Sequence, residues 1–287
     1  MSNEALVSIR PAVGENPMAL LKRVTPSAFT TGVKPGVSTE RYTHVPTSEI
    51  VEHLSLRGWL LESAGEGRVR TPGNAPFVSH TVNLRHPDFK FGTLHKGDVF
   101  PTLMLGNSHD CTTAVWMRMG FKVCTCDNQN VLRLDEIGIQ RFRHYGGTVT
   151  LMGKIYEAVN MLADYSTKAG KVLTSWKNTS VKPQQRQEYF RRVLDLRLDR
   201  VNELQSKNIM LLDERRRPEE MGSDLFTMYQ VVQEHMTRGH RTQVVLPTGE
   251  VKERTLIRPM SSTRAFVKFN EQLFGLTNTF AKEVVGA

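Results

Sequence analysis

Apolar and polar residues alternate along two stretches in the first half of the chain, and an apolar run lies between them. The alternating stretches cover residues 77–84 and 115–124, and the run extends from Phe100 to Leu105. Neighbouring side chains of a β-strand point to opposite faces of a sheet, so a repeat of two residues is typical of strands. The three stretches predict an antiparallel sheet with one face on the core and the other partly in water.

Apolar residues recur every three or four positions in the second half, as they do along one face of an amphipathic helix. We expect four helices there, the second continuing toward Leu212 and the third beginning at a Ser223 cap and ending at Gly239. Their apolar residues are, in chain order, Leu151, Ile155, Val159 and Leu162; Phe190, Val193, Leu194, Leu198 and Val201; Leu225, Met228, Tyr229, Val232 and Met236; and Phe266, Phe269, Leu273, Leu276 and Phe280.

Two shorter elements complete the expected fold. A helix around residues 50–54 should be capped by Thr47 or Ser48. Residues 242–258 read as a β-hairpin whose turn is Pro247-Thr248-Gly249. The order of elements predicts an α+β fold: a central antiparallel β-sheet covered by helices, with a basic C-terminal β-hairpin.

Proline and glycine dominate the first 40 residues, which show no sustained periodicity. We therefore expect residues 1–40 to be a flexible N-terminal arm with at most a short helix near Met18–Arg23. Such an arm is either a disordered tail or a tether to a neighbouring subunit of a homo-oligomer. Residues 41–287 are expected to form a single α+β domain.

The composition is that of a globular protein, with 39% hydrophobic residues and a mean hydropathy of -0.36. No apolar run approaches the roughly 18 residues of a membrane span, and we read no signal peptide at the N-terminus. The three cysteines, Cys111, Cys124 and Cys126, fit a reducing compartment. We therefore expect a cytoplasmic protein without a membrane partner.

Four segments of the chain resemble one family. They are the turn Asn107-Ser108-His109-Asp110 and residues 41–49, 224–239 and 269–274. The chain is similar, over roughly residues 41 to 285, to uncharacterised proteins encoded mainly by phages and plasmids, whose matching segments read NSHDGSSA and CSNGL. The resemblance implies a mobile-element context in a bacterial host. It supplies no catalytic residues that could be carried over to this chain.

The turn at residues 107–110 is followed by Cys111, and these residue types could serve chemistry. An imidazole and a carboxylate can bind a divalent ion, and a thiolate can act as a nucleophile. A turn between two strands accounts for the same residues without chemistry, because Asn, Ser and Asp favour turns. No catalytic residue is therefore predicted, and His109 and Asp110 are kept as the candidates if the protein is an enzyme.

No cofactor or metal is expected. The single residue between Cys124 and Cys126 is too few for the usual structural zinc spacing. The chain contains no GxxxxGK[ST], GxSxG or GxGxxG motif, which disfavours phosphate-loop ATPases, α/β-hydrolases and dinucleotide binding.

The net charge of +9 favours a polyanionic partner. Ten Lys/Arg face six Asp/Glu in residues 182–217, and seven face two in residues 238–268, whereas residues 218–237 hold four acids and no Lys or Arg. The alternatives are a nucleic-acid footprint and the solvated faces of amphipathic helices.

Trp116, Arg118 and Lys122 share one face of a predicted strand. Such a face could bind nucleic acid, because a base can stack on the aromatic ring while the cations contact phosphates. Core packing is the alternative role of Trp116. The candidate nucleic-acid contacts are Trp116, Arg118, Lys122, Arg191, Arg192, Arg197, Arg200, Arg215, Arg216, Arg217, Arg238, Arg241, Lys252, Arg254 and Arg258.

The leading hypothesis is a non-enzymatic nucleic-acid-binding protein, most consistent with single-stranded DNA binding or annealing in phage or plasmid recombination or replication. The alternative is an anti-defence or host-takeover protein that binds a host protein through its charge. A third hypothesis is a metal-dependent nuclease or hydrolase centred on His109 and Asp110.

Overall fold

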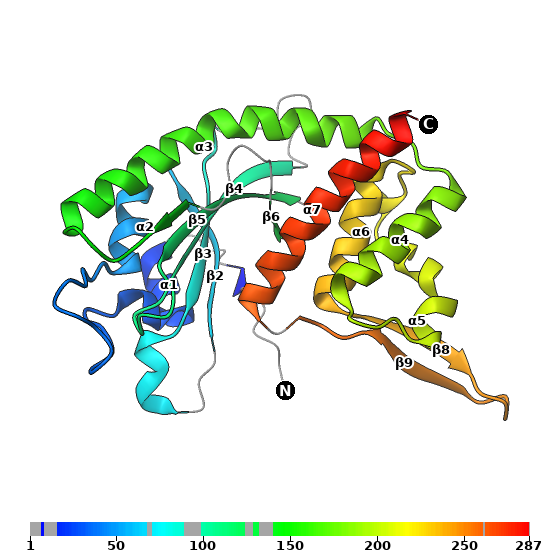
Figure 1. The fold of residues 1–287 in the computed structure, drawn as a ribbon, viewed down its shortest axis with the longest axis horizontal. Coiled ribbons are helices and arrows are strands. Elements are labelled where there is room, and N and C mark those ends of the chain that lie inside the picture. The colour runs from blue at the N-terminus through cyan, green and yellow to red at the C-terminus, as the bar shows by residue number, and fades with distance from the viewer. Residues whose placement is uncertain are drawn as a thin grey trace. The chain divides into compact units, whose positions relative to one another are not determined.

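The computed structural model describes residues 7–8, 16–67, 71–88, 99–123, 129–131, 140–260 and 262–286. The chain forms two compact units, Met1–Ala169 (unit 1) and Gly170–Ala287 (unit 2). Helix α3 (Thr148–Lys177) contributes to both, because the boundary falls within it. The large sheet belongs to unit 1, and the hairpin belongs to unit 2 (Figure 1). The region from residue 41 onward, expected as one domain, is thus divided between two units.

A seven-stranded sheet forms the centre of unit 1. Its strands follow the order β1 (Val7–Ser8), β2 (Leu60–Glu66), β3 (His80–Arg85), β4 (Val99–Asn107), β5 (Val115–Val123) and β6 (Gln129–Val131), and β7 (Gln140–Phe142) also pairs with β5. All pairs are antiparallel. Val82 lies opposite Leu105, which lies opposite Met117, so one face collects apolar residues from three strands. The predicted antiparallel sheet and α+β class are confirmed.

The other face of the sheet is largely buried as well. Its polar side chains on β3, β4 and β5 include Thr81, Asn83, Thr102, Arg118 and Lys122, and all are buried. Arg85 and Trp116 on the same face are half-buried, so this face is partly wet, as predicted, at these two residues and dry at the five buried ones. Polar groups can leave water when they are paired within the protein. Asn83 donates to the Ser63 hydroxyl at 2.8 Å, and the Lys122 ammonium lies 3.5 Å from Glu62.

Helix α1 (Pro17–Val24) occupies part of the expected N-terminal arm. It begins where the Asn16 side chain accepts a hydrogen bond from the Met18 amide at 2.9 Å, with Pro17 in the first turn. Leu20 and Leu21 are buried, as is Ala28 in the 3₁₀ helix Pro26–Phe29 that follows. This part of the segment packs into unit 1 rather than standing free of it.

Helix α2 (Thr47–Ser55) buries Ile50, Val51 and Leu54, as its apolar spacing predicts. Its cap differs from the prediction. Thr47 lies within the first turn, Pro46 precedes it, and no side chain caps the helix. The Thr47 hydroxyl is engaged elsewhere, as described below. A 3₁₀ helix, Pro72–Phe77, then precedes β3.

Unit 2 contains α4 (Pro183–Arg197), α5 (Glu203–Lys207), α6 (Leu225–Arg238) and α7 (Thr263–Gly286), with 3₁₀ helices at Ile209–Asp213 and Pro218–Glu220. Helix α4 does not continue toward Leu212, because Leu198 adopts an extended backbone and a new helix begins after it. Asp224, not Ser223, caps α6 by accepting from the Thr227 amide at 2.9 Å. Gly239, with φ of 89°, ends α6 as predicted.

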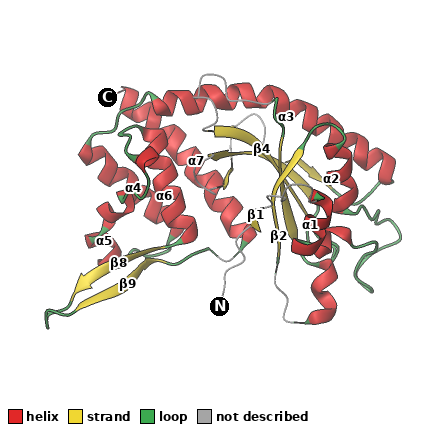
Figure 2. Ribbon diagram, turned by 180° about the vertical axis from the view of Figure 1, so that it is seen from behind, coloured by secondary structure: helices red, strands yellow, loops and turns green. Residues whose placement is uncertain are grey.

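The predicted hairpin is formed by β8 (His240–Val245) and β9 (Val251–Ile257). Figure 2 shows this ribbon extending beyond the helices of unit 2. None of the helices in the described residues combines the length and apolar character that a bilayer crossing requires. Cys124 and Cys126 lie outside the described residues.

Candidate functional site

Two of the segments noted in the sequence, around residues 42–47 and 107–110, meet in unit 1. The link between them is Asn107, at the end of β4. Its side-chain amide donates to the Thr47 hydroxyl at 3.1 Å and to the Val45 carbonyl at 3.3 Å. Asn107, Thr47 and Val45 are all buried. The short polar residues of both segments therefore build a hydrogen-bonded core instead of a simple surface turn.

The next member of this network is His80, the first residue of β3. Its Nδ1 lies 3.0 Å from the Val78 carbonyl, which can only accept, so we assign the ring proton to Nδ1. Nε2 then accepts from the Thr47 hydroxyl at 2.7 Å. Burial lowers the pKa of His80 to about 4, which keeps this neutral tautomer in place.

His144 closes the network on the other side of Asn107. Its Nε2 lies 2.9 Å from the side-chain oxygen of Asn107, and its Nδ1 lies 3.0 Å from the Thr43 backbone carbonyl. The Ser108 amide donates to the same Asn107 oxygen at 2.8 Å, which fixes the orientation of the amide. Burial lowers the pKa of His144. A neutral ring can donate to only one of the two oxygens at a time. The Tyr42 ring stacks on this imidazole at 4.7 Å.

His109 lies in the middle of this core. It is fully buried, and its ring is 4.7 Å from the ring of His44 and 5.4 Å from that of His80. Neither ring nitrogen has a hydrogen-bond partner among the described residues. Burial, reinforced by the neighbouring histidines, lowers the pKa of His109 to about 3. The imidazole is therefore neutral at physiological pH.

The Asp110 carboxylate stabilises the turn that follows β4. Its carboxylate accepts from the Ser108 hydroxyl at 2.7 Å and from the amide and hydroxyl of Thr112 at 3.0 and 2.6 Å. Burial raises the pKa of Asp110, but the hydrogen bonds from Thr112 and Ser108 lower it more. Within the described residues, no group of three or more His, Cys, Asp or Glu side chains is arranged to hold a metal ion.

A basic cavity of about 550 Å³ adjoins this core at the end of β7 and the start of α3. The described residues that line it are Arg141, Phe142, Arg143, Tyr145, Leu151 and Lys154. None of them is acidic, and no described residue forms an ion pair with any of the three cations. The Tyr145 side chain is 63% exposed. His144 lies between two of these residues in the chain, so its hydrogen bonds hold the wall of the cavity in place.

The strand face predicted for nucleic acid lies partly beside this cavity. Arg141 is the cross-strand partner of Trp116, which is half-buried. Arg118 and Lys122 are buried, and Arg118 lies 5.8 Å from the Trp116 ring. Of the three predicted residues on this face, Trp116 is thus the most accessible.

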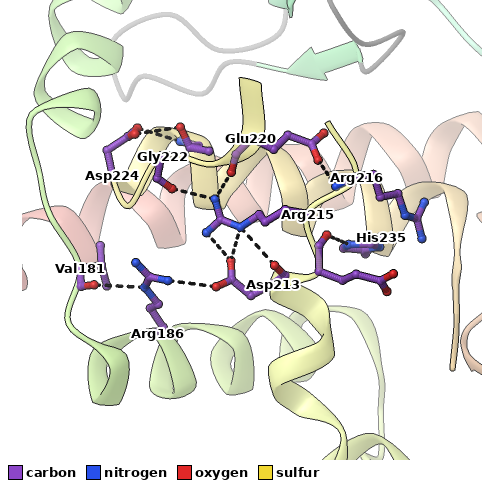
Figure 3. Close-up of polar contacts among 11 residues, drawn as sticks. Val181, Arg186, Asp213, Arg215, Arg216, Glu220, Gly222, Asp224 and His235 are labelled. Atoms are coloured by element: carbon purple, nitrogen blue, oxygen red, sulfur yellow. Dashed lines mark hydrogen bonds and ion pairs between the residues drawn. The ribbon is translucent and has the colours of Figure 1, made fainter. Parts of the chain in front are cut away.

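The arginine run at residues 215–217 points into unit 2. Arg215 donates to the Asp213 carboxylate at 2.9 and 2.5 Å, to the Gly222 carbonyl at 2.7 Å and to the Glu220 carbonyl (Figure 3). Its side chain is only 13% exposed. Arg215 therefore has a structural role in this unit, unlike the phosphate contact that the sequence suggested.

Its neighbours are also engaged. Arg217 forms a bidentate pair with Glu234, both distances being 2.8 Å. Arg216 donates to Nδ1 of the buried His240 at 3.1 Å. Asp213, Glu220 and Glu234 thus neutralise Arg215 and Arg217, whereas the described partner of the Arg216 guanidinium is an imidazole.

Most remaining cations of the predicted set also have acidic partners. Arg191 and Arg192 contact Glu188, Arg192 also contacts Glu283, Arg238 lies near Glu234, Arg241 contacts Glu253 and Lys252 contacts Glu250. Arg197, Arg200, Arg254 and Arg258 have no described acidic partner. The Arg197 guanidinium donates to the Arg258 carbonyl at 3.2 Å, which joins the end of α4 to the end of β9.

Sequence reasoning missed Arg141, Arg143, Tyr145 and Lys154. The alternation Arg141-Phe142-Arg143-His144-Tyr145 was a usable signal, because it places both arginines on one face of a strand. Lys154 joins them only through the start of α3.

No solved structure matches this chain. It is 28% identical to the UPF0380 protein YafZ of Escherichia coli (strain K12) over 220 residues, which cover 76% of each chain. It is 26% identical to the UPF0380 protein YfjQ of the same strain over 265 residues, 92% of this chain and 91% of the relative. Residues 34–267 match the family described as Domain of unknown function (DUF932), so the protein belongs to this family.

Proposed function

We propose that the protein binds nucleic acid in single-stranded form, with the basic cavity of unit 1 as the principal contact. The observation that carries this proposal is the composition of the cavity wall: Arg141, Arg143 and Lys154 line it together with the exposed Tyr145, and no described lining residue is acidic. Uncompensated cations attract phosphate groups, and their binding releases counterions from the nucleic acid.

The tyrosine favours an unpaired strand over a duplex. Bases stacked in a duplex do not offer their faces to a side chain, whereas an unpaired base can stack on an aromatic ring at about 1–3 kcal/mol per base. Tyr145 is 63% exposed, and the cavity lies within the range of small-ligand sites, roughly 300–1,000 Å³. A single nucleotide of a longer strand is the natural occupant.

Unit 2 offers a second basic surface to the same strand or to another one. Arg197, Arg200, Arg254 and Arg258 meet no described carboxylate, and the first and last are joined by a hydrogen bond. Strand annealing in phage or plasmid recombination or replication is the role that we assign to this binding. It would take place in the cytoplasm of the bacterial host.

The test is a fluorescence-anisotropy titration with labelled single-stranded and double-stranded DNA at several salt concentrations. Arg141→Ala/Arg143→Ala should weaken single-strand binding at least tenfold. It should also reduce the slope of log K against log salt by about 1.4, since each phosphate contact on single strands contributes about 0.7. Lys207→Ala is the control, because this lysine is 73% exposed, is paired with Glu203 and belongs to neither set of basic residues.

Substitutions of Tyr145 distinguish the contribution of base stacking to binding from the contribution of charge. Tyr145→Ala should weaken single-strand binding without changing the salt slope, and Tyr145→Phe should retain the affinity. Equal affinities and slopes for the wild type and the double arginine variant would reject the cavity as the contact.

A further inference from the structure

The outer part of the β8–β9 hairpin is an unusual structure for a folded protein. The ribbon has two strands, and no third strand among the described residues pairs with either edge. An isolated two-stranded hairpin is marginally stable in water, and an open edge is a template for pairing with another chain. Residues 250–255 and residue 243 are exposed, so the ribbon lacks cover on both faces (Figure 2).

The tip of the ribbon exposes an apolar pair. Val245 and Val251 lie directly opposite each other, and they are 68% and 55% exposed. Side chains opposite each other on antiparallel strands share one face of the ribbon. Leu246 and Pro247 follow in the turn, which is closed by a 2.8 Å hydrogen bond from the Gly249 amide to the Leu246 carbonyl. An apolar partner could therefore cover this tip.

The charges along the ribbon disfavour nucleic acid as that partner. Arg241 pairs with Glu253 at 2.8 Å, and Lys252 pairs with Glu250 at 3.3 Å. A surface for phosphates needs uncompensated cations, whereas of the ribbon's Arg241, Lys252 and Arg254 only Arg254 lacks a described carboxylate. Both signs alternate along β9, so an identical strand running in the opposite direction can place its carboxylates beside these cations.

From these features we infer that residues 243–253 pair with the same residues of a second copy of this chain. The two hairpins associate about a two-fold axis, as isologous interfaces do. The two Val251 residues lie opposite each other, so the valine pairs of both copies form one apolar row, and Lys252 of each copy lies opposite Glu250 of the other. This contact makes the protein a homo-oligomer and is independent of the cavity in unit 1.

The assignment also divides the hairpin between two roles. The outer ribbon serves self-association, and Arg254 and Arg258 at its base remain available to the basic surface of unit 2. Self-association does not require the N-terminal segment, for which a tether is one of the two roles expected from the sequence.

The experiment measures the mass of the full chain by sedimentation velocity over a range of concentrations. Val245→Thr/Val251→Thr replaces one methyl group of each residue with a hydroxyl group but preserves shape and strand propensity. Val245→Ile/Val251→Ile is the matched control, because it keeps the pair apolar. The wild type and the isoleucine variant should form dimers or larger assemblies, and the threonine variant should dissociate at least tenfold more readily. Circular dichroism should be the same for all three.

Two results would overturn the inference. One is a monomeric wild type at every concentration, which would leave the tip to another partner, such as a host protein. The other is a threonine variant that keeps the wild-type mass. The Arg141→Ala/Arg143→Ala protein should retain the wild-type mass, so a failure of nucleic-acid binding and a failure of self-association give different results.

Discussion

Replacing Arg215 tests whether the arginine run of unit 2 is structural. Arg215→Ala removes the donors to Asp213, Gly222 and Glu220. Hydrogen bonds to charged groups contribute about 1.5–3 kcal/mol, and removal of one partner of a buried pair costs about 3–5 kcal/mol. Asp213 is 15% exposed and keeps a 3.1 Å contact with Arg186, so the loss should fall below that upper range. We expect unit 2 to lose about 2–4 kcal/mol of unfolding free energy.

The assay is urea unfolding followed by tryptophan fluorescence, because the buried Trp176 reports on unit 2. Arg191→Ala is the control. Its side chain is 61% exposed and lies 3.6 Å from Glu188, so it should change stability by about 0.5 kcal/mol or less. Arg215→Lys should be intermediate, because an ammonium cannot reproduce the fork of the guanidinium.

Single-strand affinity measured on the same proteins completes the test. Arg215→Ala should bind DNA like the wild type under conditions where it remains folded. If it loses less than about 1 kcal/mol of stability and binds DNA more weakly, the structural role is refuted, and Arg215 is the phosphate contact that its sequence context suggests.

Two further predictions concern pH and glycine. The pKa values of His80 and His109, about 4 and about 3, lie below the ordinary histidine value, so the unfolded chain binds protons first as the pH falls. Stability should be complete above about pH 6.5 and decrease toward pH 4, by about 3 kcal/mol for His80 alone; a urea midpoint that stays constant from pH 7 to 4.5 would contradict this. Gly239→Ala should destabilise the protein by about 2 kcal/mol or more, because φ is 89° and the new methyl group would lie 2.9 Å from the Pro259 nitrogen. Gly153→Ala, where no atom lies within 4 Å of the new methyl group, should stabilise α3 by about 0.5–1 kcal/mol; thermal unfolding of the two variants should shift in opposite directions.

The sheet could be predicted because its signal is local. Alternation from Val115 to Phe121 specifies a strand whichever residues pack on it, and the structure places β5 there. The burial of the second face could not be predicted from the same stretch. Arginine and lysine are typical surface residues, so the sequence does not indicate that Arg118 and Lys122 are buried. The charge of Lys122 is neutralised by Glu62 of β2, and β2 is separated from β5 by two strands in the order of the sheet.

Helix boundaries depend on signals that spacing does not contain. Leu198 and Val201 continue the apolar spacing of α4, yet the helix ends at Arg197. An extended Leu198 and the capping side chain of Asn202, which accepts from the Gln205 amide at 2.9 Å, start a new helix instead. Asn202 was therefore the informative residue, since asparagine is a favoured helix cap.

The candidate site was predicted least well. A run of three arginines suggests a phosphate-binding surface, but Arg217 is neutralised by Glu234, 17 residues further along the chain. The charge pattern of the sequence does not reveal such an ion pair, because its two residues are far apart along the chain. The residues of the basic cavity lie within a short segment, yet Lys154 joins Arg141 and Arg143 only after β7 and α3 have been placed.

The histidine core also has a consequence for the way the chain folds as it is made. Its members lie on segments that are far apart, and His144 bonds the Thr43 carbonyl across 101 residues. Contacts of long sequence separation form late, because a large loop must close first. On the ribosome, Asn107 therefore lacks its histidine partner until β7 has been synthesised, and the polar groups that surround it must remain hydrated until that moment. A nascent chain that stalls before residue 144 would thus carry a finished set of strands around an unfinished centre, and this intermediate would be the natural substrate for chaperones.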